Sequence, residues 1–167
     1  MLVTNQRTSW RWLVGLVIVA DQATKGWAAW ALAYGQPLVI FPSFNLTLLH
    51  NQGAAFSVLA TAAGWQRWVL SALAVGVSAY LVTVLNSAQT MSRLYRCGLS
   101  LILGGAIGNL IDRVVHGYVV DFIQVYYEHW YFPAFNIADS AITVGACVLA
   151  YEILLGPGAS SALTNDR

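Results

Sequence analysis

Four long apolar segments constrain this 167-residue chain more than any other feature of its sequence. A helix that crosses the hydrocarbon core of a bilayer needs about 17 to 25 mostly apolar residues, and all four segments reach that length. We therefore predict a membrane all-α protein with four transmembrane helices. The spans are expected at residues 12–32, 65–85, 95–111 and 137–156.

The composition agrees with a membrane protein and excludes several other classes. Charged residues make up 9% of the chain, whereas a soluble globular domain carries about 25%. A chain with 58% hydrophobic residues is also unlike a disordered protein. Eight Lys and Arg against seven Asp and Glu provide no basic surface for nucleic acid. We expect one integral membrane domain over residues 1–167, with a flexible Gly-, Ser- and Ala-rich tail at 157–167 and no nucleic-acid partner.

The distribution of arginines predicts how the helices are oriented, because cytoplasmic loops carry an excess of Lys and Arg. With a cytoplasmic N-terminus, five arginines lie at cytoplasmic span ends and two at outer ends. Both termini are therefore expected in the cytoplasm, and the connections 33–64 and 112–136 outside. The inner arginines are Arg7, Arg11, Arg93, Arg96 and Arg167, and the outer ones are Arg67 and Arg113.

The connection between the first and second spans has the character of strands. Pro37 and Pro42 interrupt it, while residues 38–41 and 44–49 are apolar and partly alternating. We predict a small extracytoplasmic β-sheet between helices 1 and 2, and a periplasmic segment between helices 3 and 4. The seven tryptophans lie near predicted span ends, where amphipathic rings favour the membrane interface. They are Trp10, Trp12, Trp27, Trp30, Trp65, Trp68 and Trp130.

Ionisable residues inside the spans are costly and need a partner or a function. Asp21 and Lys25 are four positions apart on one helix face, with the acid first, which suits an ion pair. They form either a neutralised structural pair or a polar cavity organised by Lys25. In the third span, Gly104 and Gly108 form a small-xxx-small face for close helix packing.

Gly105, Asn109, Asp112 and Arg113 share another face of the third span. Asp112 and Arg113 could serve there only as charge contacts at the interface. Asp139 lies near the start of the fourth span, where an acid ordinarily stabilises the helix N-terminus. The topology nevertheless brings four acids to the outer leaflet, Asp21, Asp112, Asp121 and Asp139, which is more than capping explains.

Two carboxyl groups held close together share one proton, so one acts as general base on a water and the other as general acid. Such a pair hydrolyses an amide without a metal or a covalent intermediate. His50, His116 and His129 lack metal-ligand spacing, so we expect neither a metal nor a cofactor. The residues alone leave open which two of the four acids form the pair.

Two other function classes compete with hydrolysis at this point. A proton relay or small transporter could use Asp21, Lys25 and Asp112, but a relay should carry polar residues through both leaflets. The inner half-spans contain few beyond Glu152. A structural or assembly factor held together by its glycine faces gives no reason for acids at the lipid boundary.

Five sequence blocks, in order along residues 10–156, resemble the bacterial lipoprotein signal peptidases, also called signal peptidase II, an aspartyl intramembrane peptidase family. Any one block is weakly specific, whereas five in this order on a chain with four spans are strongly so. The blocks are Asp21-Gln22-Ala23-Thr24-Lys25, Asn51-Gln52-Gly53-Ala54-Ala55-Phe56-Ser57, residues 104–113, Val119-Val120-Asp121-Phe122 and residues 132–139.

The resemblance implies which residues act in the site. It places the catalytic pair on Asp121 and Asp139, which resolves the choice that the residues alone leave open. It also implies a supporting set that positions the substrate and the catalytic acids. That set is Asp21, Lys25, Asn51, Gly53, Asn109, Arg113 and Asn136.

The resemblance further implies the activity and its setting. The expected enzyme is an aspartic endopeptidase that removes the signal peptide of a prolipoprotein, cleaving before a cysteine modified with diacylglycerol. We expect it to act as a monomer in the bacterial cytoplasmic (inner) membrane, in contact with membrane lipid, with its active site near the periplasmic face. An inhibitor of the globomycin type is expected to block it, which would make the enzyme an antibiotic target.

Overall fold

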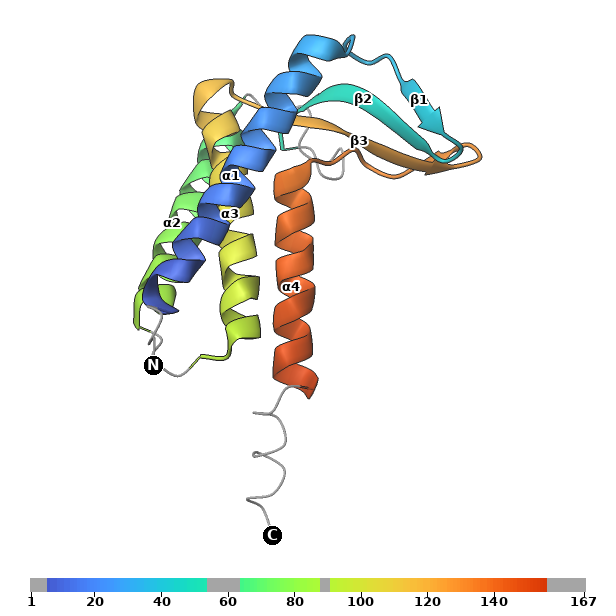
Figure 1. Cartoon of the computed structure of the whole chain (residues 1–167). Helices are drawn as coiled ribbons and strands as arrows, with labels where there is room; N and C mark the ends of the chain where they lie inside the picture. Colours follow the sequence, from blue (N-terminus) through green and yellow to red (C-terminus); the bar gives the residue numbers. More distant parts are fainter. Residues whose placement is uncertain (1–5, 54–63, 88–90, 156–167) are drawn as a thin grey trace.

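The computed structural model describes residues 6–53, 64–87 and 91–155, so the predicted tail at 157–167 lies outside the described residues. This part of the chain contains four helices and four strands, and Figure 1 shows the helices side by side with the sheet at one end of the bundle. The helices are α1 (Gln6–Ala31), α2 (Trp65–Ser87), α3 (Arg93–Val115) and α4 (Ile137–Leu155). α3 is central, because it packs against each of the other three helices.

Three of the helices, α2, α3 and α4, are long and apolar enough to cross a membrane, counted over the described residues. α1 does not meet the same test, although its 26 residues would suffice in length. The reason is chemical, since Asp21, Gln22 and Lys25 lie within it and lower its mean hydropathy. The four predicted helices are thus present, and three of them are long and apolar enough to be membrane spans.

α3 extends further than the sequence predicted, from Arg93 to Val115 instead of 95–111. Ser92 caps its start, where the side-chain oxygen accepts a hydrogen bond from the Tyr95 N–H at 3.0 Å. At the other end the polar Asp112 and Arg113 suggested that the span had finished. The helix continues because Asp112 is buried inside the protein, where other elements provide its hydrogen-bond partners.

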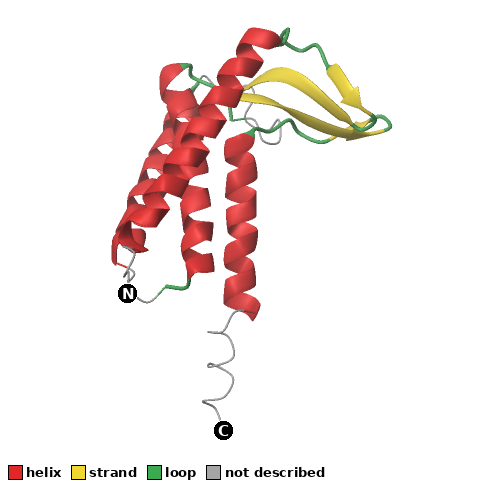
Figure 2. Cartoon of the chain, in the orientation of Figure 1, coloured by secondary structure: helices red, strands yellow, loops and turns green. Residues whose placement is uncertain are grey.

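The strands are β1 (Leu38–Phe41), β2 (Phe44–Asn51), β3 (Val119–Tyr127) and β4 (Trp130–Tyr131). They form one antiparallel sheet in the order β1-β2-β3-β4, drawn in yellow in Figure 2 where the view shows them. The small sheet predicted between α1 and α2 is present as β1 and β2, but the sheet is larger than predicted, because β3 and β4 come from the connection between α3 and α4. A two-stranded hairpin alone is marginal in water, and β3 supplies the additional partner.

The sheet is attached to the bundle by a small apolar cluster. Leu48 of β2 and both Val120 and Phe122 of β3 pack against Ala28 and Leu32 at the end of α1. Burial of such side chains contributes roughly 1.5 to 3 kcal/mol each. This contact fixes the root of the sheet, where Asn51 and Asp121 lie, over the ends of the helices.

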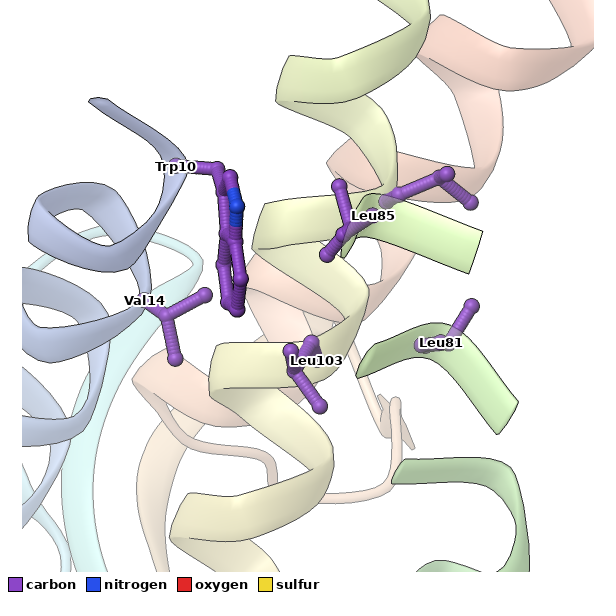
Figure 3. Packing of buried hydrophobic residues seen from close by; sticks show 6 residues of the cluster. Trp10, Val14, Leu81, Leu85 and Leu103 are labelled. Carbon is purple, nitrogen blue, oxygen red and sulfur yellow. The ribbon is translucent and has the colours of Figure 1, made fainter. Parts of the chain in front are cut away.

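A second apolar cluster holds α1, α2 and α3 together at the opposite end of the bundle, around Trp10, Val14, Leu85 and Leu103. Figure 3 shows the ring of Trp10 between α1 and α3. Only 8% of Trp10 is exposed, so the prediction that it anchors at the interface is wrong. The other six tryptophans expose 46 to 85% of their surface, as an interfacial ring requires.

Glycines on α3 permit close contact with both flanking helices. A Cβ at Gly104 would lie 2.7 Å from Val17 of α1, and one at Gly108 would lie 2.6 Å from the Asp21 carboxylate. A Cβ at Gly105 would overlap the Ala138 carbonyl oxygen at the start of α4. The predicted small-residue face is confirmed, and Gly105 adds a second face toward α4.

The substitution Gly105→Ala should therefore destabilise the protein by about 1 to 3 kcal/mol, because α3 and α4 must separate to admit the methyl group. The measurement is the thermal unfolding temperature of the full chain in detergent micelles. Gly76→Ala on α2 is the matched control, since no atom lies within 4 Å of its Cβ position. Equal unfolding temperatures for the two variants would contradict the predicted helix contact.

Candidate active site

Polar side chains from five elements meet where α1, α3 and α4 reach the root of the sheet. α1 and α3 contribute residues from their sheet-proximal halves, α4 from its first turn, and β2 and β3 from the ends that join the bundle. Hydrogen bonds and ion pairs connect all of them into one network. The members are Asp21, Gln22, Lys25, Asn51, Asn109, Asp112, Asp121, Asn136 and Asp139.

Lys25 is the cation of this network, and it is only 3% exposed. Its Nζ lies 2.8 Å from Asp21 Oδ2 and 3.0 Å from Asp112 Oδ2, and it donates to Asn109 Oδ1 at 2.9 Å. The predicted pair between Asp21 and Lys25 is confirmed. The interpretation of Asp112 as an interfacial charge is wrong, since it is 1% exposed and is the second carboxylate on Lys25.

Gln22 was missed by the sequence analysis, yet it links the same two carboxylates. Its Nε2 donates to Asp21 Oδ2 at 3.1 Å, to Asp112 Oδ1 at 3.0 Å and to the Gly108 carbonyl at 3.2 Å. Two carboxylates on one ammonium need further donors to satisfy their oxygens when buried. The only sign of its role in the sequence is a neutral amide inside an apolar span, and the spacing of charged residues does not reveal it.

Asp121 lies on β3, is 2% exposed and accepts hydrogen bonds on both oxygens. Asn136 Nδ2 donates to Oδ1 at 2.7 Å, and Asn51 Nδ2 donates to Oδ2 at 3.0 Å. Asn51 is held in turn by the Gly53 N–H, which donates to Asn51 Oδ1 at 2.9 Å. Gly53 has φ +101°, a conformation that favours glycine, and a Cβ there would lie 2.6 Å from Leu70.

Asp139 lies in the first turn of α4 and is half-buried. The cap of this helix is Asn136, whose Oδ1 accepts from the Asp139 N–H at 2.9 Å. The carboxylate of Asp139 instead points across to α3, where Oδ1 accepts from Asn109 Nδ2 at 2.7 Å. The interpretation of Asp139 as a cap of its own helix is therefore wrong, because Asn136 fills that role and the Asp139 carboxyl group is bound by α3.

The two asparagines beside the acids have defined orientations. Lys25 donates to Asn109 Oδ1, so the Asn109 amide nitrogen is the atom that faces Asp139. The Asp139 backbone N–H donates to Asn136 Oδ1, so the Asn136 amide nitrogen faces Asp121. An ammonium and a backbone N–H can only donate, which excludes the flipped side-chain amides. Each acid thus accepts a hydrogen bond from an amide whose orientation another group fixes.

The environment raises the pKa of Asp121 from 3.8 to about 7. Burial is the largest cause, and the negative charge of Asp139 is the next. The hydrogen bonds from Asn51 and Asn136 and the charge of Lys25 lower this pKa and offset part of the rise. At neutral pH the Asp121 carboxyl therefore retains a proton for a large share of the time.

Arg113 completes the set of predicted residues, and its Nη1 donates to the Asn109 carbonyl at 3.3 Å. Its positive charge also acts on Asp139, Asp121 and Asp112. The structure thus places every residue of the predicted set in or beside one network. A buried carboxyl that keeps a proton next to a half-exposed carboxylate can supply both an acid and a base to a water and an amide.

Comparison with known proteins identifies the kind of protein that shares these features. The family model described as signal peptidase (SPase) II matches residues 13–155. The lipoprotein signal peptidase of Yersinia enterocolitica is 43% identical over 158 residues, covering 95% of this chain and 94% of the relative. The lipoprotein signal peptidase of Yersinia pestis (strain Pestoides F) matches with the same identity and coverage.

Solved structures give the same result for the fold. A bacterial membrane enzyme determined by the in meso method at 2.3 Å superposes with a TM-score of 0.78 and 28% identity, covering 95% of this chain and 92% of that one. A second, at 1.9 Å, has a TM-score of 0.73 and 29% identity, covering 95% and 94%. From the family match over most of its length and from its close relatives, this chain belongs to the signal peptidase II family.

Proposed function

We propose that this protein is an aspartic endopeptidase that removes the signal peptide from prolipoproteins, with Asp121 and Asp139 as its catalytic pair. Membership of the signal peptidase II family and the names of its relatives support the activity. One observation carries the choice of residues. Of the four acids in the network, Asp21 and Asp112 are both paired with Lys25, whereas Asp121 and Asp139 are bound only by neutral donors among the hydrogen bonds and ion pairs described.

The surroundings of the two acids favour different roles. Asp139 lies in the first turn of α4, is oriented by Asn109 and is the more exposed of the two acids, so it is the one that faces an incoming water. Asp121 is the buried member, and its pKa of about 7 allows it to hold the proton. Asp139 is therefore the general base and Asp121 the general acid.

The reaction follows from these roles. Asp139 takes a proton from a water molecule, whose oxygen forms a bond to the scissile carbonyl carbon, while Asp121 donates its proton toward the carbonyl oxygen. The tetrahedral intermediate then collapses and the C–N bond breaks. The leaving amine takes up the proton that Asp139 received, and the carbonyl oxygen returns its proton to Asp121.

The remaining network residues position this pair. Asn109 and Asn136 orient the acids, and Asn51 with Gly53 holds the second oxygen of Asp121. Asp21 accepts from the Ala138 N–H at 2.9 Å, which ties the start of α4 to α1. Arg113 provides a positive charge at the same end of α3 for positioning the substrate.

We assign α1 as the fourth membrane span. Its low mean hydropathy comes from Asp21, Gln22 and Lys25, and these side chains bond to one another and to α3 and α4. Neutralised in this way, they present little charge to lipid. Four spans put both termini on one side, and the arginine count supports the cytoplasm of a bacterial inner membrane for that side, with the site near the outer face. The enzyme is proposed to act as a monomer that a globomycin-type inhibitor blocks.

The first prediction concerns the pair itself. Asp121→Asn and Asp139→Asn should each lower the rate of cleavage by at least about 10²-fold, because each removes one proton-transfer group. The assay measures release of the signal peptide from a lipidated precursor by the full chain in detergent. Glu152→Gln on α4 is the control for loss of a carboxylate and should cleave normally. Near-normal turnover by either folded Asp variant would exclude the pair.

The second prediction is a pH dependence with a defined direction. Because the acid form of Asp121 is lost as pH rises through about 7, kcat/KM should fall above that value. Asn51→Ala removes a donor that favours the charged form, so the pKa of Asp121 should rise and the fall should move to higher pH. A fall that moves to lower pH in Asn51→Ala, or no fall in wild type, would contradict the role of Asp121.

The third prediction tests Lys25 as a positioning residue. Lys25→Met leaves Asp21 and Asp112 buried without their cation, which should cost roughly 3 to 5 kcal/mol of stability. Thermal unfolding should show this loss together with reduced turnover, whereas Arg93→Gln at an exposed position of α3 should change stability by about 0.5 kcal/mol or less. If Lys25→Met abolished turnover with stability and substrate affinity intact, Lys25 would belong to the chemistry instead.

A further inference from the structure

Asp112 makes three contacts that the proposed chemistry does not use. Its Oδ2 accepts from the Val120 N–H at 3.0 Å and pairs with Lys25 Nζ at 3.0 Å. Its Oδ1 accepts from Gln22 Nε2 at 3.0 Å. The side chain is almost fully buried. A single carboxylate on α3 thus binds one group of β3 and two groups of α1.

The contact with Val120 acts on the strand directly before Asp121. The Val120 N–H is bound by Asp112, and the Val120 carbonyl accepts from Asn136 Nδ2 at 3.2 Å. Two residues further along, the Phe122 N–H donates to the Phe135 carbonyl at 3.1 Å. The N–H groups of Val120 and Phe122 point from the same edge of β3. Asp121 is therefore held between two fixed points on this edge.

We propose that Asp112 is a positioning residue for Asp121, acting through the Val120 amide, and that Gln22 holds Asp112 in place for this task. The proposal rests on the proposed function, in which Asp121 is the general acid. Asp112 has no contact with Asp139 among the hydrogen bonds and ion pairs described. Its effect on the reaction passes through the backbone of β3.

A carboxylate is the side chain that these contacts require. Both oxygens of Asp112 accept, and the three groups that surround them all donate. An asparagine has one acceptor oxygen, so its amide N–H groups would face either Gln22 Nε2, or the Val120 N–H together with Lys25 Nζ. Asp112→Asn therefore keeps the shape of the side chain but loses the contacts of one oxygen, either that with Gln22 or those with Val120 and Lys25. Asp112→Ala loses both.

The experiment measures the local stability of β3 and the catalytic rate on the same full-length variants in detergent. Hydrogen–deuterium exchange is followed at the Val120 amide, and kcat and KM are determined with a lipidated precursor. In Asp112→Ala we expect exchange at Val120 to rise and kcat to fall, each by about 10-fold or more, as for loss of a hydrogen bond to a charged acceptor. KM should change by less than about threefold. Gln22→Met should change both in the same direction by a smaller factor.

Ser100→Ala is the matched control, since Ser100 is a buried polar residue of α3 whose Oγ donates to the Arg96 carbonyl within the same helix. It should leave Val120 exchange and kcat unchanged. If Asp112→Ala does not fold, Asp112→Asn and Gln22→Met decide the question, since they retain the volume of the side chain.

Three results would overturn the inference. Folded Asp112 variants that cleave at the wild-type rate would show that the contact is not needed. Loss of kcat with unchanged Val120 exchange would place Asp112 in the chemistry, and a large rise in KM with unchanged kcat would make it a substrate-binding residue. Failure of the proposed function is a separate result, namely an active Asp121→Asn or an inactive wild type, and the exchange measurement still tests the Asp112 contact in that case.

Discussion

The structure depends on one ammonium group shared by two buried carboxylates. Lys25 brings Asp21 and Asp112 together, and each of these acids also binds a backbone N–H, that of Ala138 at the start of α4 for Asp21 and that of Val120 in β3 for Asp112. Burying three charges costs several kcal/mol each before they interact. This cost is offset by the attraction between the ions. The same ions also fix the position of the start of α4, through Asp21, and of β3, through Asp112. Both proposed catalytic acids follow directly after these two bound backbone groups.

The four acids of the network have two kinds of partner, one charged and one neutral. Asp21 and Asp112 have a cation as partner, whereas Asp121 and Asp139 have asparagine amides. A cation in direct contact would hold either acid permanently ionised, which would leave no proton to donate. An amide orients a carboxyl group in either protonation state. Lys25 therefore acts on Asp139 through Asn109, at the distance of one intervening side chain.

Much of the fold was predictable because its signals are local. The apolar length of each helix, the pair of Asp21 and Lys25 four positions apart, and the strand character of residues 38–49 are all properties of short segments. The pairing of β2 with β3 was not predictable in this way, since Leu49 and Asp121 are distant in sequence and no local pattern specifies their register. The end of α3 was misjudged for a related reason, because the polarity of Asp112 indicates water until its buried partners are known.

The choice of the catalytic pair shows the same limit. From the residues alone the four acids were equivalent candidates, and the resemblance to a family selected two of them. The structure supplies a physical distinction that spacing could not, because Asp112 is engaged by Lys25 from another helix while Asp121 is not in contact with a cation among the bonds described. Gln22 was missed since a neutral amide beside Asp21 has no periodic signal of its own.

The two proposed catalytic acids lie on different elements of the fold. Asp121 belongs to a sheet at the end of the bundle, and Asp139 belongs to a helix within the bundle (Figure 1). The two acids are thus carried by different elements, which are joined at the root of the sheet by apolar side chains, by the buried ions and by hydrogen bonds from β3 to Phe135 and Asn136, directly before α4. A displacement of about 1 Å between reacting groups is enough to cost a large part of a catalytic rate. The spacing of the two carboxyl groups is consequently set at the root of the sheet, where β3 and the residues before α4 are hydrogen-bonded to each other.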